Sequence, residues 1–353
     1  MATSLGAEEA TVEYREAGVD IEAADSAVAR IAQIVARTFT ERVASPIGGF
    51  GALYEIGGLG GARPTLVATT DGVGTKTEVA RAGARYEGLG RDLVAMCVDD
   101  LVVTGATPLF FLDYLALGRV EPSLVALLVD AMAAALGEVG ASLIGGEIAE
   151  HPGVLEPGQV DLAGFCVGIV DGDATLGSER VRAGDRVLGL RSPNLRSNGF
   201  SLVRRVYADV LEAVARGETG PLLADGRPLY DALIEPSVLY APLVLEFARA
   251  GLLHAAAHVT GGGLAGNLVR VLPTGLGVEV KPWAWPEIFR RLADDGDVSL
   301  EAMRATFNLG IGMVLIAPPD AASALRERVP DAVDLGVVEA SDEGVTWSTT
   351  VPS

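Results

Sequence analysis

Residues 66–76 constrain the fold more than any other stretch of the chain. An apolar run over 66–68 continues as Thr-Thr-Asp-Gly-Val-Gly-Thr-Lys over 69–76. An apolar run that ends in glycines and polar residues predicts a buried strand followed by a tight loop. Similar runs recur before Glu147, before Asn198 and before the glycine triplet 261–263, with apolar helical stretches between them. Strands that alternate with helices in this way predict an α/β fold.

Residues 69–76 bring a carboxylate, two glycines and an ammonium group into one loop. Asp71 offers the oxygen ligands that Mg²⁺ prefers, the glycine amides let phosphate oxygens approach, and Lys76 can neutralise them. The order of residues is not that of a Walker A loop. Lys76 is one of only two lysines, the other being Lys281. The stretch therefore predicts a metal–phosphate site; the alternative is an ordinary glycine-rich turn with a solvated lysine.

Length and charge indicate the organisation and exclude some partners. A chain of 353 residues, of which 49% are hydrophobic, is long enough for two packed cores. Turn residues cluster at 171–185, so we expect an N-terminal domain over 1–170 and a C-terminal α/β domain over 171–345. The formal net charge of −20 argues against a nucleic-acid or anionic-membrane partner.

The cysteines and the first residues favour a cytoplasmic location. Cys97 and Cys166 lie in apolar runs without neighbours at metal-ligand spacing, which predicts buried, reduced thiols. Glu8, Glu9 and Glu13 come early in the chain without a preceding positive charge, unlike a signal peptide. No apolar run is expected to reach the roughly 18 residues of a membrane helix.

Several acidic residues fall on elements that are otherwise apolar. Residues 88–104 predict a helix that is apolar nearly all round yet carries Asp92, Asp99 and Asp100. A buried acid is costly without a partner, so we expect a metal ion or a ligand hydroxyl there, although Asp99 alone could equally be solvated. Asp113, in a strand predicted at 108–115, is expected to cap or bridge within the sheet. Glu147 follows two glycines and is favoured as a ligand over a turn residue.

The glycine triplet 261–263 allows two interpretations. With Gly266 it matches the spacing of a dinucleotide fingerprint, and Glu279 follows about 20 residues later. Residues 255–259 would make a poor central strand, so we favour a helix N-terminus that exposes free amides to an anion. His254 and His258 are expected to be structural, and a total of three histidines argues against a multi-histidine metal site.

Many long segments match one known family, in that family's order. They are AGVDI at 17–21, GGFG at 48–51, TTDGVGTK at 69–76, DLVAM at 92–96, DLVV at 100–103, PLFFLDY at 108–114, GGEIAEHPG at 145–153, AGFCVG at 163–168, SNGFSLVR at 197–204, HVTGGG at 258–263 and TFNLGIGM at 306–313. On these segments the chain resembles the aminoimidazole ribonucleotide synthetase family, also called phosphoribosylformylglycinamidine cyclo-ligase. The resemblance covers nearly the whole length and is far more specific than any single motif.

The resemblance implies a fold, a partner and a reaction. The subunit would have two α/β domains and form a homodimer, in which the N-terminal domains pair their sheets into a barrel-like core with ATP near the interface. The implied cofactors are ATP and Mg²⁺, and the implied substrate is a small ribonucleotide. ATP would phosphorylate the formamide oxygen of formylglycinamidine ribonucleotide, the amidine nitrogen would attack the activated carbon, and phosphate would leave. Such ring closure depends on positioning and charge neutralisation.

The resemblance also implies which residues of this chain form the site, because they stand at positions that match the family's motifs. The resemblance implies that Asp71, Asp100 and Glu147 bind the metal–nucleotide complex, with support from Asp92, and that Lys76 contacts phosphate. The residues implied to act in catalysis are Asp71, Lys76, Arg196 and Asn198. Further nucleotide or substrate contacts are implied for a mobile loop of Gly49, Phe50 and Gly51, and for Gly72, Gly74, Thr75, Ser197, Gly199, Gly262 and Gly263.

Three positions depart from the family pattern. Arg196 stands where the family usually has histidine, Ile148 stands where it usually has threonine, and the glycine loop is shorter at 44–47. Arginine stays cationic and cannot act as a base, and isoleucine brings no hydroxyl group. Two alternatives to the cyclo-ligase therefore stay open. One is a paralogous ATP-dependent enzyme that activates a related amide or amidine in a specialised pathway, and the other is a non-catalytic nucleotide-binding protein.

Overall fold

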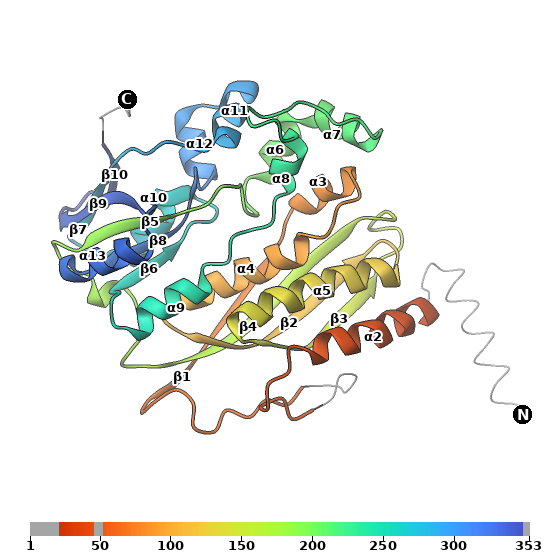
Figure 1. Ribbon diagram of the computed structural model, residues 1–353, viewed down its shortest axis with the longest axis horizontal. Coiled ribbons are helices and arrows are strands. Elements are labelled where there is room, and N and C mark those ends of the chain that lie inside the picture. The colour runs from red at the N-terminus through yellow and green to blue at the C-terminus, as the bar shows by residue number, and fades with distance from the viewer. Residues whose placement is uncertain (1–20, 46–51, 349–353) are drawn as a thin grey trace, which may run out of the picture.

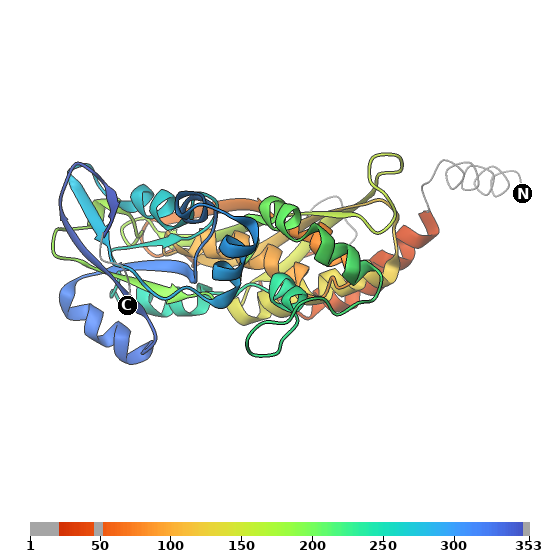
Figure 2. The same cartoon turned by 90° about the horizontal axis from the view of Figure 1, so that it is seen from above.

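The structure is a computed structural model that describes residues 21–45 and 52–348. Two sheets with their helices lie side by side along the long axis of the molecule (Figures 1 and 2). The first sheet is built from residues 64–171 and the second from residues 186–347. The chain is therefore a mixed α/β protein with two parts, as predicted. Gly49, Phe50 and Gly51 lie outside the described residues.

The N-terminal half is a four-stranded mixed sheet. Its strands follow the order β1-β4-β2-β3, in which β1 and β2 are antiparallel to β4 and β3 is parallel to β2. Helices α4 and α5 pack on one face, and α2 packs beside α5 (Figure 1). The elements are α2 (Ile21–Ala36), β1 (Pro64–Gly72), α3 (Lys76–Ala82), α4 (Leu89–Val102), β2 (Thr107–Leu117), α5 (Pro122–Val139), β3 (Ser142–Glu150) and β4 (Val160–Asp171).

Helix α5 corrects one expectation from the sequence. It has 18 residues with a hydropathy of 1.6, so it is long and apolar enough to cross a membrane, although no run was expected to reach that length. Val125, Leu128 and Met132 are buried on one side of this helix. They belong to the same core as α4. Packing within the fold thus accounts for the apolar composition of α5.

The opposite face of the N-terminal sheet has no described helix packed on it. Successive residues of a strand point to opposite faces, so the residues that alternate with the core residues point to this side. Along β4, burial alternates strictly from Val160 to Phe165. Leu66 of β1, Tyr114 of β2 and Phe165 of β4 are 56%, 41% and 40% exposed. We call this apolar surface the open face.

The C-terminal half is a six-stranded sheet in the order β10-β7-β9-β5-β8-β6. All neighbouring strands are antiparallel except β10 and β7. Because β6 is an antiparallel edge strand, the glycine triplet that follows it is not part of a parallel dinucleotide-binding unit. The elements are β5 (Arg186–Arg191), α6 (Phe200–Val206), α7 (Ala208–Ala215), α8 (Leu229–Ile234), α9 (Ala241–Arg249), β6 (Ala255–His258), α10 (Gly263–Leu268), β7 (Leu276–Val280), α11 (Glu287–Gly296), α12 (Leu300–Thr306), β8 (Ile311–Ala317), α13 (Pro319–Arg328), β9 (Val333–Ala340) and β10 (Val345–Trp347).

The two halves share a packed junction. Helix α9 belongs to the second half in sequence but packs against α4 of the first. Its residues Val244, Leu245 and Phe247 are part of the same buried cluster as Leu93 of α4. The junction brings α4 and the end of β1 next to the end of β6 and the segment after β5.

Two strands extend further than the sequence indicates. The residues Gly145, Gly146 and Glu147 lie inside β3 and not in a loop after it, because β3 continues to pair with β2 as far as Glu150. Asp71 likewise lies inside β1. Glycine tolerates the extended conformation as well as a turn, so its presence alone does not end a strand.

Candidate functional site

Three of the four glycine-containing segments meet at the junction. Thr75 Oγ1 lies 3.3 Å from Ser201 Oγ, which joins the loop after β1 to the start of α6. A Cβ atom added to Gly261 would lie 3.8 Å from Asn198 Oδ1, so the glycine triplet faces the Ser-Asn-Gly segment. Segments that are far apart in the sequence therefore border one site.

The charges of Asp71 and Asp100 interact at this site, and we call these two residues the carboxylate pair. Burial raises the pKa of Asp71, the Gly72 amide opposes that effect, and the charge of Asp100 adds to it. The Asp100 side chain is 41% exposed, so the pair is open on one side. Two neighbouring carboxylates repel each other and favour a bound cation, and their oxygens are ligands of the kind that Mg²⁺ prefers.

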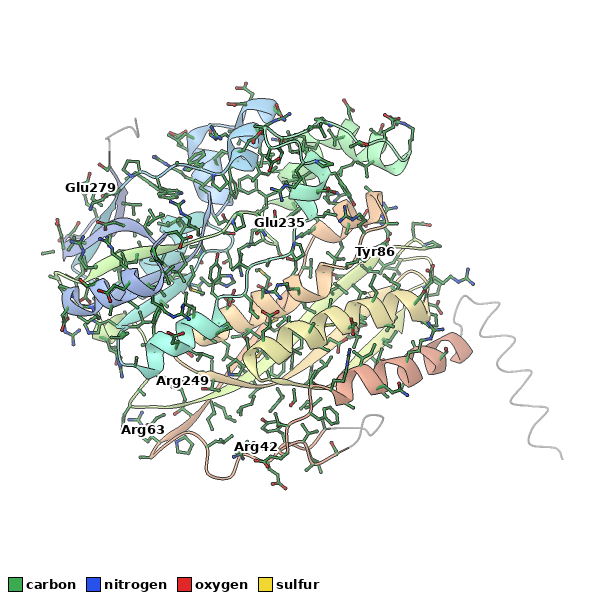
Figure 3. The ribbon with its side chains drawn as sticks, viewed as in Figure 1. Arg42, Arg63, Tyr86, Glu235, Arg249 and Glu279 are labelled. Carbon is green, nitrogen blue, oxygen red and sulfur yellow. The ribbon has the colours of Figure 1, made fainter. Side chains whose placement is uncertain are left out.

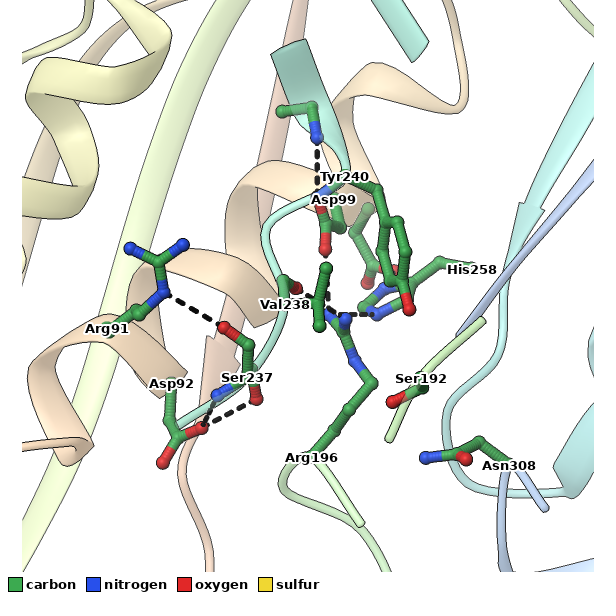
Figure 4. Close-up of polar contacts among 12 residues, drawn as sticks. Arg91, Asp92, Asp99, Ser192, Arg196, Ser237, Val238, Tyr240, His258 and Asn308 are labelled. Carbon is green, nitrogen blue, oxygen red and sulfur yellow. Dashed lines mark hydrogen bonds and ion pairs between the residues drawn. The ribbon is translucent and has the colours of Figure 1, made fainter. Parts of the chain in front are cut away.

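Arg196 is buried between the two halves (Figure 4). Its Nη2 atom lies 2.7 Å from Asp99 Oδ2 and 3.0 Å from His258 Nε2, and Nη1 donates to the Val238 carbonyl at 2.6 Å. Asp99 Oδ1 accepts hydrogen bonds from two backbone amides at the start of α9, at 2.9 and 3.0 Å. Asp99 is therefore the buried partner of an ion pair and not a solvated residue.

Lys76 forms a second buried ion pair. Its Nζ atom lies 2.6 Å from Asp92 Oδ2 and donates to the Glu235 carbonyl at 2.8 Å (Figure 3 labels Glu235). Asp92 Oδ1 accepts from the amide and the hydroxyl of Ser237 at 2.8 and 2.6 Å. Burial lowers the pKa of Lys76, whereas Asp92 raises it. Lys76 thus joins α3 to α4 and to the segment before α9, and its ammonium group is enclosed by protein and is not exposed to a phosphate.

Glu147 lies apart from this site within one chain. Asp71 pairs with Gly164 across the sheet, Gly164 pairs with Asp113, and Asp113 pairs with Gly146. Three strand spacings, about 14 Å, therefore separate the backbones. Glu147 follows Gly146 and points to the open face, whereas Asp71 points to the face covered by helices.

The expected three-carboxylate cluster does not form in a single copy of the chain. Within residues 21–45 and 52–348, no three His, Cys, Asp or Glu side chains are grouped as a metal site. One copy brings Asp71 and Asp100 together without Glu147, because the sheet register separates them.

The glycines of the site have two different roles. A Cβ at Gly199 would lie 2.1 Å from the Phe307 ring, and a Cβ at Gly263 would lie 1.8 Å from the Arg304 carbonyl oxygen, so packing requires glycine there. Gly74 and Gly262 have φ values of +65° and +93° and face more open space. Helix α10 has only six residues, which is too short for the anion-binding helix N-terminus that the sequence favours.

The Ser-Asn-Gly segment offers free polar atoms. Ser197 Oγ is buried and has no hydrogen-bond partner among the described residues. A buried hydroxyl without a partner costs free energy, so this position suits a polar ligand atom. Asn198 is partly exposed beside it.

At two of the positions that depart from the family pattern, the side chain packs inside the protein. Arg196 is fully buried against Asp99. Ile148 pairs with Leu115 on the helix-covered side and packs against the core. Neither side chain therefore adds a free group to the site. The third departure, at 44–47, lies partly outside the described residues.

Sequence reasoning missed the part played by Asp99 and His258. Asp99 is adjacent to Asp100 on an apolar helix, and His258 comes just before the glycine triplet, so both carried a signal. Their partners lie in the other half of the molecule, Arg196 at a separation of 97 residues and Asp100 at 158 residues. No local pattern connects residues at such separations.

Comparison with known proteins matches both halves of the chain. The family described as "AIR synthase related protein, N-terminal domain" matches residues 51–170, and the corresponding C-terminal domain matches residues 182–348. A phosphoribosylformylglycinamidine cyclo-ligase from Xanthomonas oryzae pv. oryzae is 45% identical over 320 residues, which cover 90% of this chain and 92% of that protein. One from a Synechococcus species is 42% identical over 343 residues, with coverages of 94% and 95%.

Solved structures share the fold at lower identity. A thiamine-monophosphate kinase from Stenotrophomonas maltophilia has a TM-score of 0.64 at 23% identity, covering 91% of this chain and 96% of that one. The hydrogenase maturation protein HypE, solved in complex with ATP, has a TM-score of 0.61 at 19% identity, with coverages of 89% and 87%. At these identities the likeness concerns the fold alone.

Proposed function

The chain belongs to the AIR synthase related family, and from this premise we propose that it is an ATP-dependent cyclo-ligase of purine synthesis. The reaction converts formylglycinamidine ribonucleotide to aminoimidazole ribonucleotide, with release of ADP and phosphate and formation of a C–N bond. The observation that carries the proposal is 45% identity to a curated cyclo-ligase over 90% of the chain.

Asp71 and Asp100 are the proposed ligands of a Mg²⁺ ion that accompanies ATP. The fit rests on the donor set, which is two interacting carboxylates with one open side and a raised pKa at Asp71. Bound there, the ion would neutralise phosphate charge during phosphoryl transfer.

Groups around the carboxylate pair are proposed to contact the nucleotide and the ribonucleotide substrate. Gly72, Gly74 and Thr75 closely follow Asp71 in the chain, and the segment 197–199 faces the glycine triplet that contains Gly262. Lys76 and Asp92 are proposed to act as positioning residues, because their buried ion pair holds the loop after β1 against α4.

A homodimer formed through the open face is also proposed. Leu66, Tyr114 and Phe165 expose apolar surface on this sheet, and pairing with a second copy would remove that surface from water. Glu147 points to the same face. Any contribution of Glu147 to nucleotide binding is therefore proposed to reach the site across the dimer and not within one chain.

A cytoplasmic location is proposed on the state of the thiols. Cys97 and Cys166 are both free and buried, which suits a reducing compartment.

The two alternatives differ from the cyclo-ligase in measurable turnover. We expect the purified chain to release one ADP for each aminoimidazole ribonucleotide formed when it is given formylglycinamidine ribonucleotide, ATP and Mg²⁺. A coupled assay follows ADP, and diazotisation follows the aminoimidazole product. Turnover only with another amide or amidine would instead indicate the paralogue. ATP binding without turnover of any such substrate would indicate a nucleotide-binding protein.

Matched variants test the proposed metal ligands. Asp71→Asn keeps the shape of the side chain but removes its charge, so it should abolish most of the turnover and weaken Mg²⁺–ATP binding in calorimetry. Asp173→Asn removes an acid whose side chain is 68% exposed in a surface ion pair with Arg63, and it should leave both unchanged. Equal effects of the two substitutions would contradict the assignment.

A further inference from the structure

A continuous row of polar side chains leads from the interior to Asp100 of the carboxylate pair, and Figure 4 labels its three inner members. Its members are Asp99, Arg196, His258 and Asp100, and the successive distances are 2.7, 3.0 and 2.7 Å. Asp99 and Arg196 are fully buried, the His258 side chain is 1% exposed, and the Asp100 side chain is 41% exposed. The row therefore starts in the packed junction and ends at the open side of the site.

The chemistry of arginine sets the direction of the hydrogen bonds in this row. A guanidinium group has five N–H donors and no acceptor. At 3.0 Å, Arg196 Nη2 can only donate to His258 Nε2, so Nε2 carries the lone pair. The ring proton of His258 then lies on Nδ1, where it donates to Asp100 Oδ1 at 2.7 Å.

Three hydrogen bonds orient the Arg196 guanidinium group toward His258. One hydrogen of Nη2 goes to Asp99, the other goes to His258, and Nη1 donates to the Val238 carbonyl. The guanidinium carbon also lies 4.9 Å from the centre of the Tyr240 ring. The backbone of Arg196 adopts φ +59°, a left-handed conformation that is uncommon for a residue other than glycine. Such a conformation persists only where the surrounding structure enforces it.

We propose that Arg196 is a positioning residue for the metal–nucleotide site and acts through His258. By fixing the Nδ1–H form of His258, it engages Oδ1 of Asp100 in a hydrogen bond and leaves Oδ2 available to a metal ion. Hydrogen bonding of a ligating carboxylate by a second group orients it and tunes its affinity for the metal. The proposal rests on the proposed function, since it concerns the same carboxylate pair.

A histidine at position 196 could not fix the tautomer of His258 in this way. A neutral histidine can donate or accept at either ring nitrogen, so it would not dictate which nitrogen of His258 carries the proton. Arginine can only donate and therefore allows one arrangement. Asp99 balances its charge, so Arg196 and Asp99 form a matched pair in this chain.

The tautomer of His258 tests the proposal without any nucleotide. The chain holds three histidines, so the ring signals of ¹⁵N-histidine-labelled protein can be assigned by comparison with His151→Gln and His254→Gln variants. We expect the two-bond ¹H–¹⁵N pattern of His258 at pH 7.5 to be that of the Nδ1–H form. The Nε2–H pattern in the unmodified protein would overturn the proposal.

A double variant tests the effect on binding. Arg196→Met combined with Asp99→Asn removes both charges together, so that neither is left buried alone, and asparagine can still accept from the α9 amides. We expect His258 to lose its single tautomer and the Kd for Mg²⁺–ATP in calorimetry to rise about tenfold. An unchanged tautomer and an unchanged Kd in the folded double variant would refute the proposal. If that variant fails to fold, the tautomer of His258 in the unmodified protein still decides whether Arg196 acts on His258 as proposed.

A control separates positioning from general support of the junction. Tyr230→Phe removes the hydroxyl group that bonds the Val79 and Ala80 carbonyls, at another contact between the two halves, without touching the row. It should lower the Tm but leave the His258 spectrum and the Kd for Mg²⁺–ATP unchanged, and a rise in Kd equal to that of the double variant would contradict the proposal. Failure of the unmodified chain to bind Mg²⁺–ATP would count against the proposed function, whereas the tautomer measurement still tests the action of Arg196 on His258.

Discussion

At the scale of single residues, the environment of Asp113 on β2 shows how burial changes a carboxyl group. A Cβ atom on Gly146 would lie 2.2 Å from Asp113 Oδ1, so the side chain lies over the neighbouring strand at a position that only glycine leaves free. Burial raises the pKa of Asp113 to about 7 from 3.8. The folded protein therefore keeps a proton on Asp113 at pH values where the unfolded chain has lost it.

This difference gives stability a defined dependence on pH. Below pH 3.8 both states hold the proton, between pH 3.8 and about 7 the folded state loses stability as pH rises, and above about 7 the loss is complete. Asparagine is neutral throughout. Asp113→Asn should therefore match the parent near pH 4 and exceed it by about 2–4 kcal/mol at pH 8, measured by urea unfolding. A difference that does not vary with pH, as expected for the exposed control Asp173→Asn, would contradict burial of the Asp113 carboxyl group as the cause.

Lys76 shows the opposite case, a buried cation with a dedicated partner. Lys76→Met would leave the Asp92 carboxylate buried and without its cation, so the free energy of unfolding should fall by about 3–5 kcal/mol. The exposed pair of Arg328 with Glu246 provides the control, because Arg328→Met removes a solvated ion pair and should change little. Urea unfolding at pH 7.5 compares the two variants. Similar losses for both would show that the Lys76 pair has no special role in stability.

At the scale of elements, the turn between β6 and α10 depends on one glycine. Gly263 has φ +65°, and its Cα approaches the end of α12 so closely that a side chain would meet the Arg304 carbonyl oxygen at 1.8 Å. Gly266 lies in the same helix, and an added Cβ there would have no heavy atom within 4 Å beyond the neighbouring backbone of the helix. The two glycines thus offer a matched pair with different surroundings.

Substituting alanine at these two positions should change the free energy of unfolding in opposite directions. Gly263→Ala combines backbone strain with a clash against backbone, so it should cost about 2 kcal/mol or more. Gly266→Ala should gain about 0.5–1 kcal/mol, because alanine favours a helix and restricts the unfolded chain. Thermal unfolding of both variants provides the comparison. A loss at Gly266 as large as that at Gly263 would indicate a helix-wide effect and not a local contact.

The types of most elements follow from sequence periodicity. The apolar pattern of 88–104 predicts α4, and Pro122 marks the first residue of α5. The helix predicted at 88–104 ends at Val102 instead, and β3 runs through two glycines that were expected to end it. Helix and strand types are local properties, but their ends depend on pairing with neighbours that local sequence does not describe.

At the scale of the whole molecule, the open face makes a prediction about assembly. Phe165→Asp would put a charge at the centre of the proposed interface, and the protein should sediment as a monomer of the 36.4 kDa chain mass, whereas the parent should sediment at twice that mass. Leu222→Asp changes an apolar residue that is 53% exposed in the C-terminal half, and it should leave the dimer intact. A monomeric parent, or dissociation by both substitutions, would refute pairing through the open face.

The candidate site was predictable only in part. Asp71 and Asp100 could be singled out because acids beside glycines or on an apolar helix need a partner. The loop pattern made Lys76 a phosphate contact and the resemblance made Arg196 a catalytic group, and the structure buries both in ion pairs with Asp92 and Asp99. A charged residue in a motif looks the same in the sequence whether it faces a ligand or another side chain.

The sequence by itself determined the two-part α/β architecture, the family, and the segments that form the candidate site. Periodicity and long motifs are properties of consecutive residues, so the sequence shows them directly. The tertiary structure alone decided that Glu147 faces away from Asp71 and that Arg196 reaches His258. The first depends on the register of four strands, and the second on packing within the C-terminal half between residues 62 positions apart. Registers and packing contacts are set by the mutual fit of distant segments, which neighbouring residues do not specify.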